Sequence, residues 1–116
     1  MDHSQPARPT LAVVVPAYNE AAVLAQFHAR LAAVFDALDA EGSVLYVDDG
    51  SRDATWQVIC NLAERDPRVA ALRLARNFGK EAALTAGLDQ IDADLALVID
   101  ADLQDPPEVI AEMFAT

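Results

Sequence analysis

The chain has 116 residues, 53% of them apolar, which is enough for one globular domain with a core but too little for two. Nineteen acidic residues against eight basic ones give a net charge of -11, which argues against nucleic acid as a partner. The single cysteine, Cys60, excludes an internal disulfide and any multi-cysteine metal site. No apolar run is long enough to span a membrane, so we expect a soluble, cytoplasmic domain.

Short β-branched runs alternate with segments of helical period along the chain. Residues 1–10 are polar with two prolines and are expected to form a loose leader before a domain at 11–116. The predicted strands are 11–15, 44–47, 69–74 and 95–99. The predicted helices span 23–38, 53–65 and 80–91, and a fourth starts near 106–107. The first is expected to have its C-cap at Gly42, and the second its N-cap at Asp53.

This order predicts an α/β fold with a doubly wound, mainly parallel sheet covered by helices on both faces. Ligands bind such sheets beyond the carboxyl ends of the strands, where the strand order reverses. A 3-2-1-4 order would make the first and fourth strands neighbours. The loops after the first, second and fourth strands should then converge on one crevice.

Those three loops are polar and acidic. They read Pro16-Ala17-Tyr18-Asn19-Glu20, Asp48-Asp49-Gly50-Ser51 and Asp100-Ala101-Asp102-Leu103-Gln104. So many carboxylates at one edge would repel one another, which predicts a cation there. Asp100 and Asp102 are two residues apart, so extended backbone places both side chains on one side, and Gln104 adds a carbonyl oxygen. This set suits Mg²⁺ or Mn²⁺ bridging the protein and a diphosphate.

Several residues have two readings on the sequence alone. The segment 73–80 is basic, so Arg76 or Lys80 either faces the diphosphate or belongs to a solvated loop in which Gly79 supplies a turn. Aspartates at strand ends are also ordinary turn and cap residues, and Asp53 is expected to be only a cap. His28 has no visible partner in the sequence and is expected to pack or to face solvent.

The three loop motifs resemble the inverting family 2 glycosyltransferases, which have the GT-A fold. Residues 76–81, 86–87 and 102–107 are similar to the branch that includes dolichol-phosphate mannosyltransferases and bactoprenol glucosyltransferases. The resemblance covers residues 11–114. It implies hexosyl transfer from a UDP- or GDP-sugar to a polyprenyl phosphate, a reaction of envelope glycan synthesis.

The resemblance also implies roles for individual residues. Pro16, Tyr18 and Glu20 would border the nucleoside, Val47 and Asp49 would contact base or ribose, and Asp48 would shape that pocket. Asp100, Asp102 and Gln104 would form the metal site, the DXD motif, with Ala101 against the nucleotide and Lys80 at the diphosphate. No catalytic base is assigned.

Members of this family continue well past this length, so the chain is expected to be the nucleotide-sugar-binding front of a longer domain. Acceptor binding and membrane association would then lie in regions absent from the sequence. An exposed sheet edge would favour a homodimer.

Three alternatives stay open. A phospho-receiver domain shares the length and fold class, but it wants paired acids after the first strand, where this chain has residues 16–20. A nucleotidyltransferase wants a glycine-rich basic loop at the same place. The third is a module that binds nucleotide without turnover, and the intact pair of Asp100 and Asp102 argues mildly against a long-decayed site.

Overall fold

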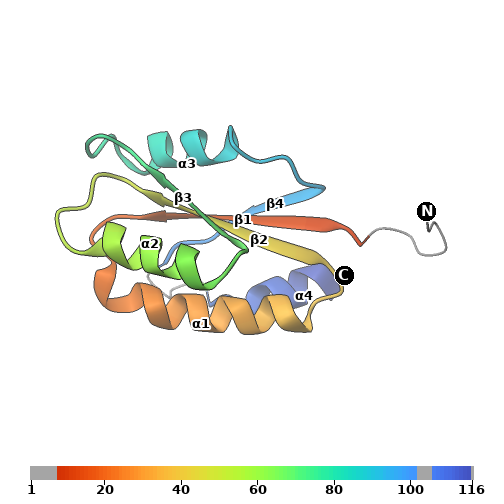
Figure 1. Ribbon diagram of the computed structural model, residues 1–116. Coiled ribbons are helices and arrows are strands. Elements are labelled where there is room, and N and C mark those ends of the chain that lie inside the picture. Colours follow the sequence, from red (N-terminus) through yellow and green to blue (C-terminus); the bar gives the residue numbers. More distant parts are fainter. Residues whose placement is uncertain (1–7, 102–105, 116) are drawn as a thin grey trace.

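The computed structural model describes residues 8–101 and 106–115, and Figure 1 shows a single sheet lying between helices. The elements alternate as expected. In chain order they are β1 (Thr10–Ala17), α1 (Ala21–Ala37), β2 (Glu41–Asp48), α2 (Thr55–Arg65), β3 (Val69–Arg73), α3 (Lys80–Leu88), β4 (Leu95–Val98) and α4 (Val109–Ala115).

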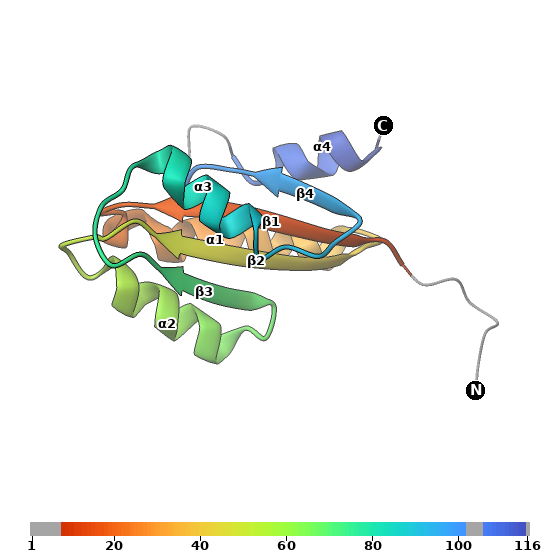
Figure 2. The same cartoon turned by 90° about the horizontal axis from the view of Figure 1, so that it is seen from above.

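The sheet has the order β3-β2-β1-β4, and every pair of neighbours is parallel, as Figure 2 shows from above. Val13 of β1 is in register with Val44 of β2 and Leu97 of β4. The prediction of a doubly wound parallel sheet in the order 3-2-1-4 is therefore confirmed. The order reverses between β1 and β4, which places the carboxyl ends of β2, β1 and β4 side by side.

The two faces of the sheet are covered unequally. Helices α1, α2 and α4 lie on one face, whereas α3 lies alone on the other (Figure 1). Leu11, Val13 and Val15 belong to the larger core cluster, and Val14 belongs to the smaller one. Helices cover both faces, as expected, although α3, which lies alone on its face (Figure 1), has only nine residues. On the edge strand β4, Leu95 and Val98 are each 43% exposed. Leu95 pairs with Leu11 of the larger cluster and Val98 with Val14 of the smaller one, so the two side chains lie on opposite faces of the sheet.

The end of α1 differs from the prediction for a reason that lies in tertiary packing. The helix ends at Ala37 with Leu38 at the C-cap, and Gly42 lies inside β2. A Cβ at Gly42 would come within 2.5 Å of the Phe35 ring. Position 42 therefore requires a glycine because the Phe35 ring packs directly against its backbone, and Gly42 does not end the helix.

Other element ends shift by one to three residues. Thr10 belongs to β1 and not to the leader, because its backbone N–H and hydroxyl both donate to Asp94. Helix α3 ends at Leu88 instead of residue 91, and α4 begins at Val109. Ala54, not Asp53, is at the N-cap position of α2. Within the part of the chain that is described, no helix is long and apolar enough to cross a membrane.

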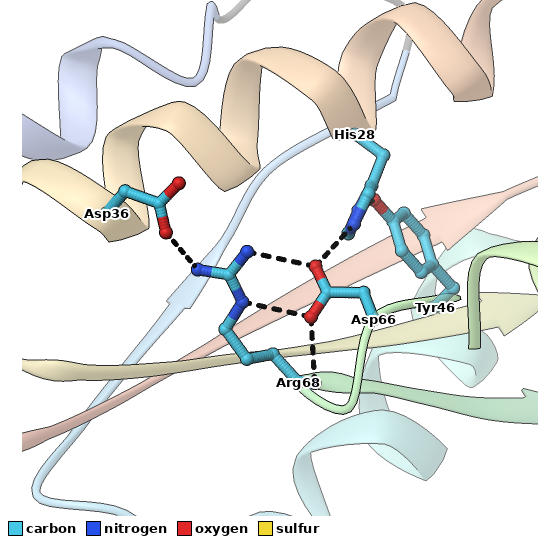
Figure 3. A network of polar contacts seen from close by, with 5 residues as sticks. All are labelled: His28, Asp36, Tyr46, Asp66 and Arg68. Carbon is cyan, nitrogen blue, oxygen red and sulfur yellow. Dashed lines mark hydrogen bonds and ion pairs between the residues drawn. The ribbon is translucent and has the colours of Figure 1, made fainter. Parts of the chain in front are cut away.

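A polar network that is buried at His28 and Tyr46 and reaches the surface at Asp36 connects α1 to β2 and to the loop before β3 (Figure 3). His28 Nδ1 lies 2.7 Å from the Tyr46 hydroxyl, and its Nε2 lies 2.9 Å from Asp66 Oδ2. Arg68 donates to both oxygens of Asp66 and also pairs with Asp36 on α1. His28 does pack, as expected, but it does so with polar partners that are distant in the sequence.

This network also shifts pKa values. Hydrogen bonds from the side chain of Arg68, then from its backbone N–H and from His28, outweigh the effect of burial and hold the pKa of Asp66 well below its usual range. Burial raises the pKa of the Tyr46 hydroxyl strongly, and the charge of Asp66 adds to that rise. Tyr46 is therefore neutral and Asp66 ionised near neutral pH.

Candidate functional site

A crevice of about 160 Å³ opens at the carboxyl ends of β1, β2 and β4. Its lining combines the loops that follow these three strands, as the sequence predicted. The lining residues are Pro16, Ala17, Tyr18, Glu20, Asp49, Asp100 and Ala101. All but Ala17 were singled out from the sequence, and the predicted convergence of the three loops is confirmed.

The loop between β1 and α1 is shaped by Asn19. Its backbone has a φ of 54°, a left-handed conformation that asparagine tolerates better than most residues. The Asn19 side-chain carbonyl accepts hydrogen bonds from the N–H groups of Arg52 at 2.9 Å and Asp53 at 3.4 Å. Its own N–H donates to the hydroxyl of Ser51. The turn that carries Tyr18 and Glu20 is thereby fixed to the loop after β2.

Asp53 and Thr55 add a second set of bonds between the same two loops. The N–H of Glu20 donates to the Thr55 hydroxyl, and the N–H of Ala21 donates to Asp53 Oδ2. Asp53 also accepts from the N–H and the hydroxyl of Thr55. Burial raises the pKa of Asp53, but these hydrogen bonds lower it by more. Asp53 thus accepts hydrogen bonds from the first turns of both α1 and α2, whereas the sequence predicted only a cap for α2.

Asp48 lies behind the crevice and not in its wall. The side chain is fully buried, and Oδ1 accepts from the N–H of Ser51. Oδ2 has no hydrogen-bond partner within the described ranges, and the nearest positive charge is Arg73, whose Nε lies 3.5 Å away. Arg73 also lies over the Trp56 ring. One of the acidic charges expected to attract a cation is therefore balanced by the protein itself.

Asp49 is 5% exposed and forms part of the crevice wall. Its Oδ1 accepts the N–H of Phe78 at 2.9 Å, and its Oδ2 accepts the N–H of Gly79 at 3.1 Å. The loop between β3 and α3 is thus held against the crevice by a carboxylate. This contact could not be predicted from the sequence, because the partners are 29 and 30 residues apart.

The remaining predicted residues are placed as follows. Val47 is fully buried in the core cluster with Val14 and Leu45 and does not line the crevice. Lys80 is the first residue of α3, at the end of the loop that Asp49 holds. Asp102 and Gln104 lie outside the described residues, so of the expected metal ligands only Asp100 is placed, in the crevice wall. In the described ranges, 8–101 and 106–115, no three or more histidine, cysteine or acidic side chains form a metal-binding group.

A larger cavity, of about 540 Å³, lies at the opposite edge of the sheet. It is lined by residues near the amino ends of β1, β2 and β3 and by the turn after α3, including Ser43, Ala70, Ala71 and Ile91. Size alone would favour it as a ligand site. The crevice is preferred because it lies at the carboxyl ends of the strands, where the order reverses, and gathers polar groups from three loops.

The chain is similar to known proteins over most of its length. Residues 12–116 match the family model described as glycosyl transferase family 2. A Bacillus subtilis (strain 168) protein named uncharacterized glycosyltransferase YkcC is 44% identical over 101 residues, which are 87% of this chain and 31% of that protein. The bactoprenol glucosyl transferase of Shigella phage SfV is 42% identical over 103 residues, which are 89% of this chain and 34% of that protein.

A solved structure shows the same fold. The mannosyltransferase PcManGT from Pyrobaculum calidifontis, in complex with GDP-Man and Mn²⁺, superimposes with a TM-score of 0.76 and 27% identity, covering 90% of this chain and 31% of that one. The α/β sheet is therefore that of the GT-A glycosyltransferases, as the motifs implied. The chain spans about a third of the length of the relatives that it matches.

Proposed function

Because this chain belongs to glycosyl transferase family 2, we propose that it binds the nucleoside-diphosphate sugar in an inverting, metal-dependent hexosyl transfer to a polyprenyl phosphate. The observation that carries the proposal is the crevice at the carboxyl ends of β1, β2 and β4. It gathers Tyr18, Asp49 and Asp100 from three separate loops at the place where such sheets bind nucleotides.

The nucleoside is assigned to the part of the crevice formed by the first loop. Pro16 and Tyr18 offer apolar surface, and the Tyr18 ring is 39% exposed, so a base has a surface against which to lie. Glu20 and Asp49 are the acceptors near a ribose or base edge. Val47 and Asp48 act from behind the wall by fixing the end of β2. Ala101 is small enough to leave room for the nucleotide, and Lys80 is assigned to the diphosphate.

A divalent cation, Mg²⁺ or Mn²⁺, is assigned to Asp100, Asp102 and Gln104. The carboxylate of Asp100 lies in the crevice wall and is a hard oxygen donor, which fits such an ion. The GDP-Man complex of the Pyrobaculum protein, which contains Mn²⁺, supports the same assignment. When bound, the ion would neutralise the negative charge that develops on the departing nucleoside diphosphate.

The acceptor is assigned from chemistry and from the bactoprenol glucosyl transferase relative. A phosphate oxygen of the polyprenyl phosphate forms the new bond to the anomeric carbon while the bond from that carbon to the diphosphate oxygen breaks. Attack from the side opposite the leaving group inverts the configuration. A phosphate is already anionic at neutral pH, so the step needs no dedicated general base. Acceptor and membrane contacts are assigned to a longer protein that carries this chain.

The open edge of the sheet at β4 is a second place for association. Leu95 and Val98 are each 43% exposed on this edge strand. Either further strands of a longer protein or a second copy of the chain would pair there. Analytical ultracentrifugation of the chain separates the two, because only pairing with a second copy gives a dimer.

Calorimetric titration of UDP, GDP and inorganic phosphate, with and without Mn²⁺, tests the proposed function. One nucleotide should bind selectively and only with the metal, and Asp102→Ala should abolish the metal dependence. Asp92→Ala, an exposed residue at the opposite edge of the sheet, is the control and should bind like the wild type. Equal binding of nucleotide and phosphate, or metal dependence that survives in Asp102→Ala, would contradict the assignment.

A further inference from the structure

The turn between β1 and α1 presents two residues to the crevice and keeps the one between them out of it. Tyr18 and Glu20 line the crevice, whereas Asn19 does not. The backbone of Asn19 is in the left-handed region, with a φ of 54°. The conformation at this single residue therefore determines the course of the chain from one crevice residue to the next.

The side chain of Asn19 bonds to the loop after β2. Its Oδ1 accepts the N–H of Arg52 at 2.9 Å and the N–H of Asp53 at 3.4 Å. Both N–H groups belong to the segment between β2 and α2, which lies outside any helix or strand. One side-chain oxygen thus supplies the acceptor that regular backbone pairing would otherwise provide.

The backbone of Asn19 is linked to the buried end of β2. Its N–H donates to the hydroxyl of Ser51 at 2.8 Å, and the N–H of Ser51 donates to Oδ1 of the fully buried Asp48 at 3.0 Å. Asp49, which follows Asp48 and lines the crevice, donates its own N–H to the carbonyl of Ala17 at 2.9 Å. The first and second loops are therefore held together directly beside the crevice.

We propose that Asn19 is a positioning residue for the nucleoside: it sets the separation between Tyr18 on the first loop and Asp49 on the second. This inference rests on the proposed function, because it presumes a nucleoside in the crevice. The Tyr18 side chain is 39% exposed, so its place depends on the backbone of the turn more than on packing around the ring. Asn19 itself makes no contact with the ligand in this account, since it lies outside the lining.

Two substitutions at position 19 separate positioning from other roles. Asn19→Gly allows the left-handed backbone and keeps the N–H but removes the side-chain acceptor. Asn19→Asp keeps an acceptor oxygen and tolerates the same backbone conformation. Asn61→Gly makes the same change at an exposed position on α2 and is the control for a general loss of stability. The dissociation constants of UDP and GDP are measured with Mn²⁺ by calorimetric titration.

Asn19→Gly should weaken binding of the nucleotide that the wild type prefers by about tenfold, because the acceptor of two hydrogen bonds is lost. Asn19→Asp should stay within about threefold of the wild type at physiological salt, since the added charge is exposed and screened. Asn61→Gly should bind like the wild type. Amide hydrogen exchange at Arg52 and Asp53 should accelerate in Asn19→Gly and not in Asn19→Asp.

Three results would overturn the positioning role. Unchanged affinity in Asn19→Gly would show that only the backbone conformation matters at this position. An equal loss in Asn19→Gly and Asn19→Asp would show that the amide group itself is needed, as in a direct contact with the ligand. A loss in Asn61→Gly as large as in Asn19→Gly would assign the effect to general destabilisation.

The same data distinguish failure of this inference from failure of the proposed function. If the wild-type protein binds neither UDP nor GDP, the proposed function fails, and the positioning role fails with it. If the wild type binds and the variants do not follow the expected order, only the positioning role fails. A circular dichroism spectrum that matches the wild type shows that each variant is folded. If Asn19→Gly does not fold, Ser51→Ala removes the acceptor of the Asn19 N–H instead, and unchanged affinity in that variant would overturn the proposal.

Discussion

Tyr46→Phe removes one oxygen atom from the centre of the structure. The Tyr46 ring is fully buried and meets the Phe27 ring edge-on at 6.4 Å between centroids. Its hydroxyl lies 2.7 Å from Nδ1 of His28, a residue that is itself only 6% exposed. Phenylalanine keeps the ring packing and leaves the imidazole nitrogen without its partner. The variant therefore isolates one buried hydrogen bond.

The expected cost follows from that geometry. Loss of one partner of a buried hydrogen bond costs about 1 to 3 kcal/mol, because the other partner stays away from water. His28 still contacts Asp66 at 2.9 Å, so its second nitrogen remains satisfied and the cost should lie near the middle of this range, at about 2 kcal/mol. A cavity term adds little, since only a hydroxyl is removed.

The assay is urea denaturation followed by circular dichroism, with Tyr18→Phe as the matched control. The sequence contains only these two tyrosines, and the Tyr18 side chain is 39% exposed. The control should change the free energy of unfolding by less than about 0.5 kcal/mol. If Tyr46→Phe is no more destabilising than Tyr18→Phe, the buried network does not hold α1 to the sheet.

Two further changes test the charges of the fold. The pKa of Asp66 is lower in the folded state, so the ionised carboxylate stabilises the fold above the unfolded pKa of about 3.9, and this stabilisation is lost as pH falls through the folded pKa. The free energy of unfolding, measured from pH 5 to 2.5, should therefore decline less steeply in Asp66→Asn than in the wild type. Equal slopes in the two proteins would contradict this. Arg73→Met leaves the buried Asp48 carboxylate without its counter-charge and should cost about 1 to 3 kcal/mol in denaturation. Arg65→Met, exposed on α2, should cost clearly less, and a similar loss in both variants would show that Arg73 does not balance Asp48.

The fold was predictable because its signals are local. Residues 11–15 and 44–47 are short apolar runs rich in valine, which is typical of buried strands, and the helical segments between them favour parallel crossovers. The end of α1 was not predictable in this way. Glycine is a common residue at the end of a helix, so the sequence favours Gly42 as a C-cap. In the structure Gly42 lies in β2 and packs against the Phe35 ring, a contact that forms only after folding.

The candidate site was predictable to the same extent. The sequence identified the three loops, because polar residues after apolar strands stand out. It did not reveal how the loops are held, since Asn19 contacts Ser51 and Arg52, and Asp49 contacts Phe78, across about 30 residues. The asparagine at position 19 is a local signal, because asparagine adopts the left-handed conformation of turns more readily than most residues, and Asn19 has a φ of 54°.

The central claim is that nucleotide binds at the carboxyl ends of the strands, although the larger cavity lies at the opposite edge. The most direct test is to map backbone amide chemical shifts by NMR while UDP or GDP is added with Mg²⁺. The account predicts that the shifts concentrate at residues 17–20, 49–53 and 76–79. Shifts that concentrate instead at Ser43, Ala70, Ala71 and Ile91, around the larger cavity, would contradict it.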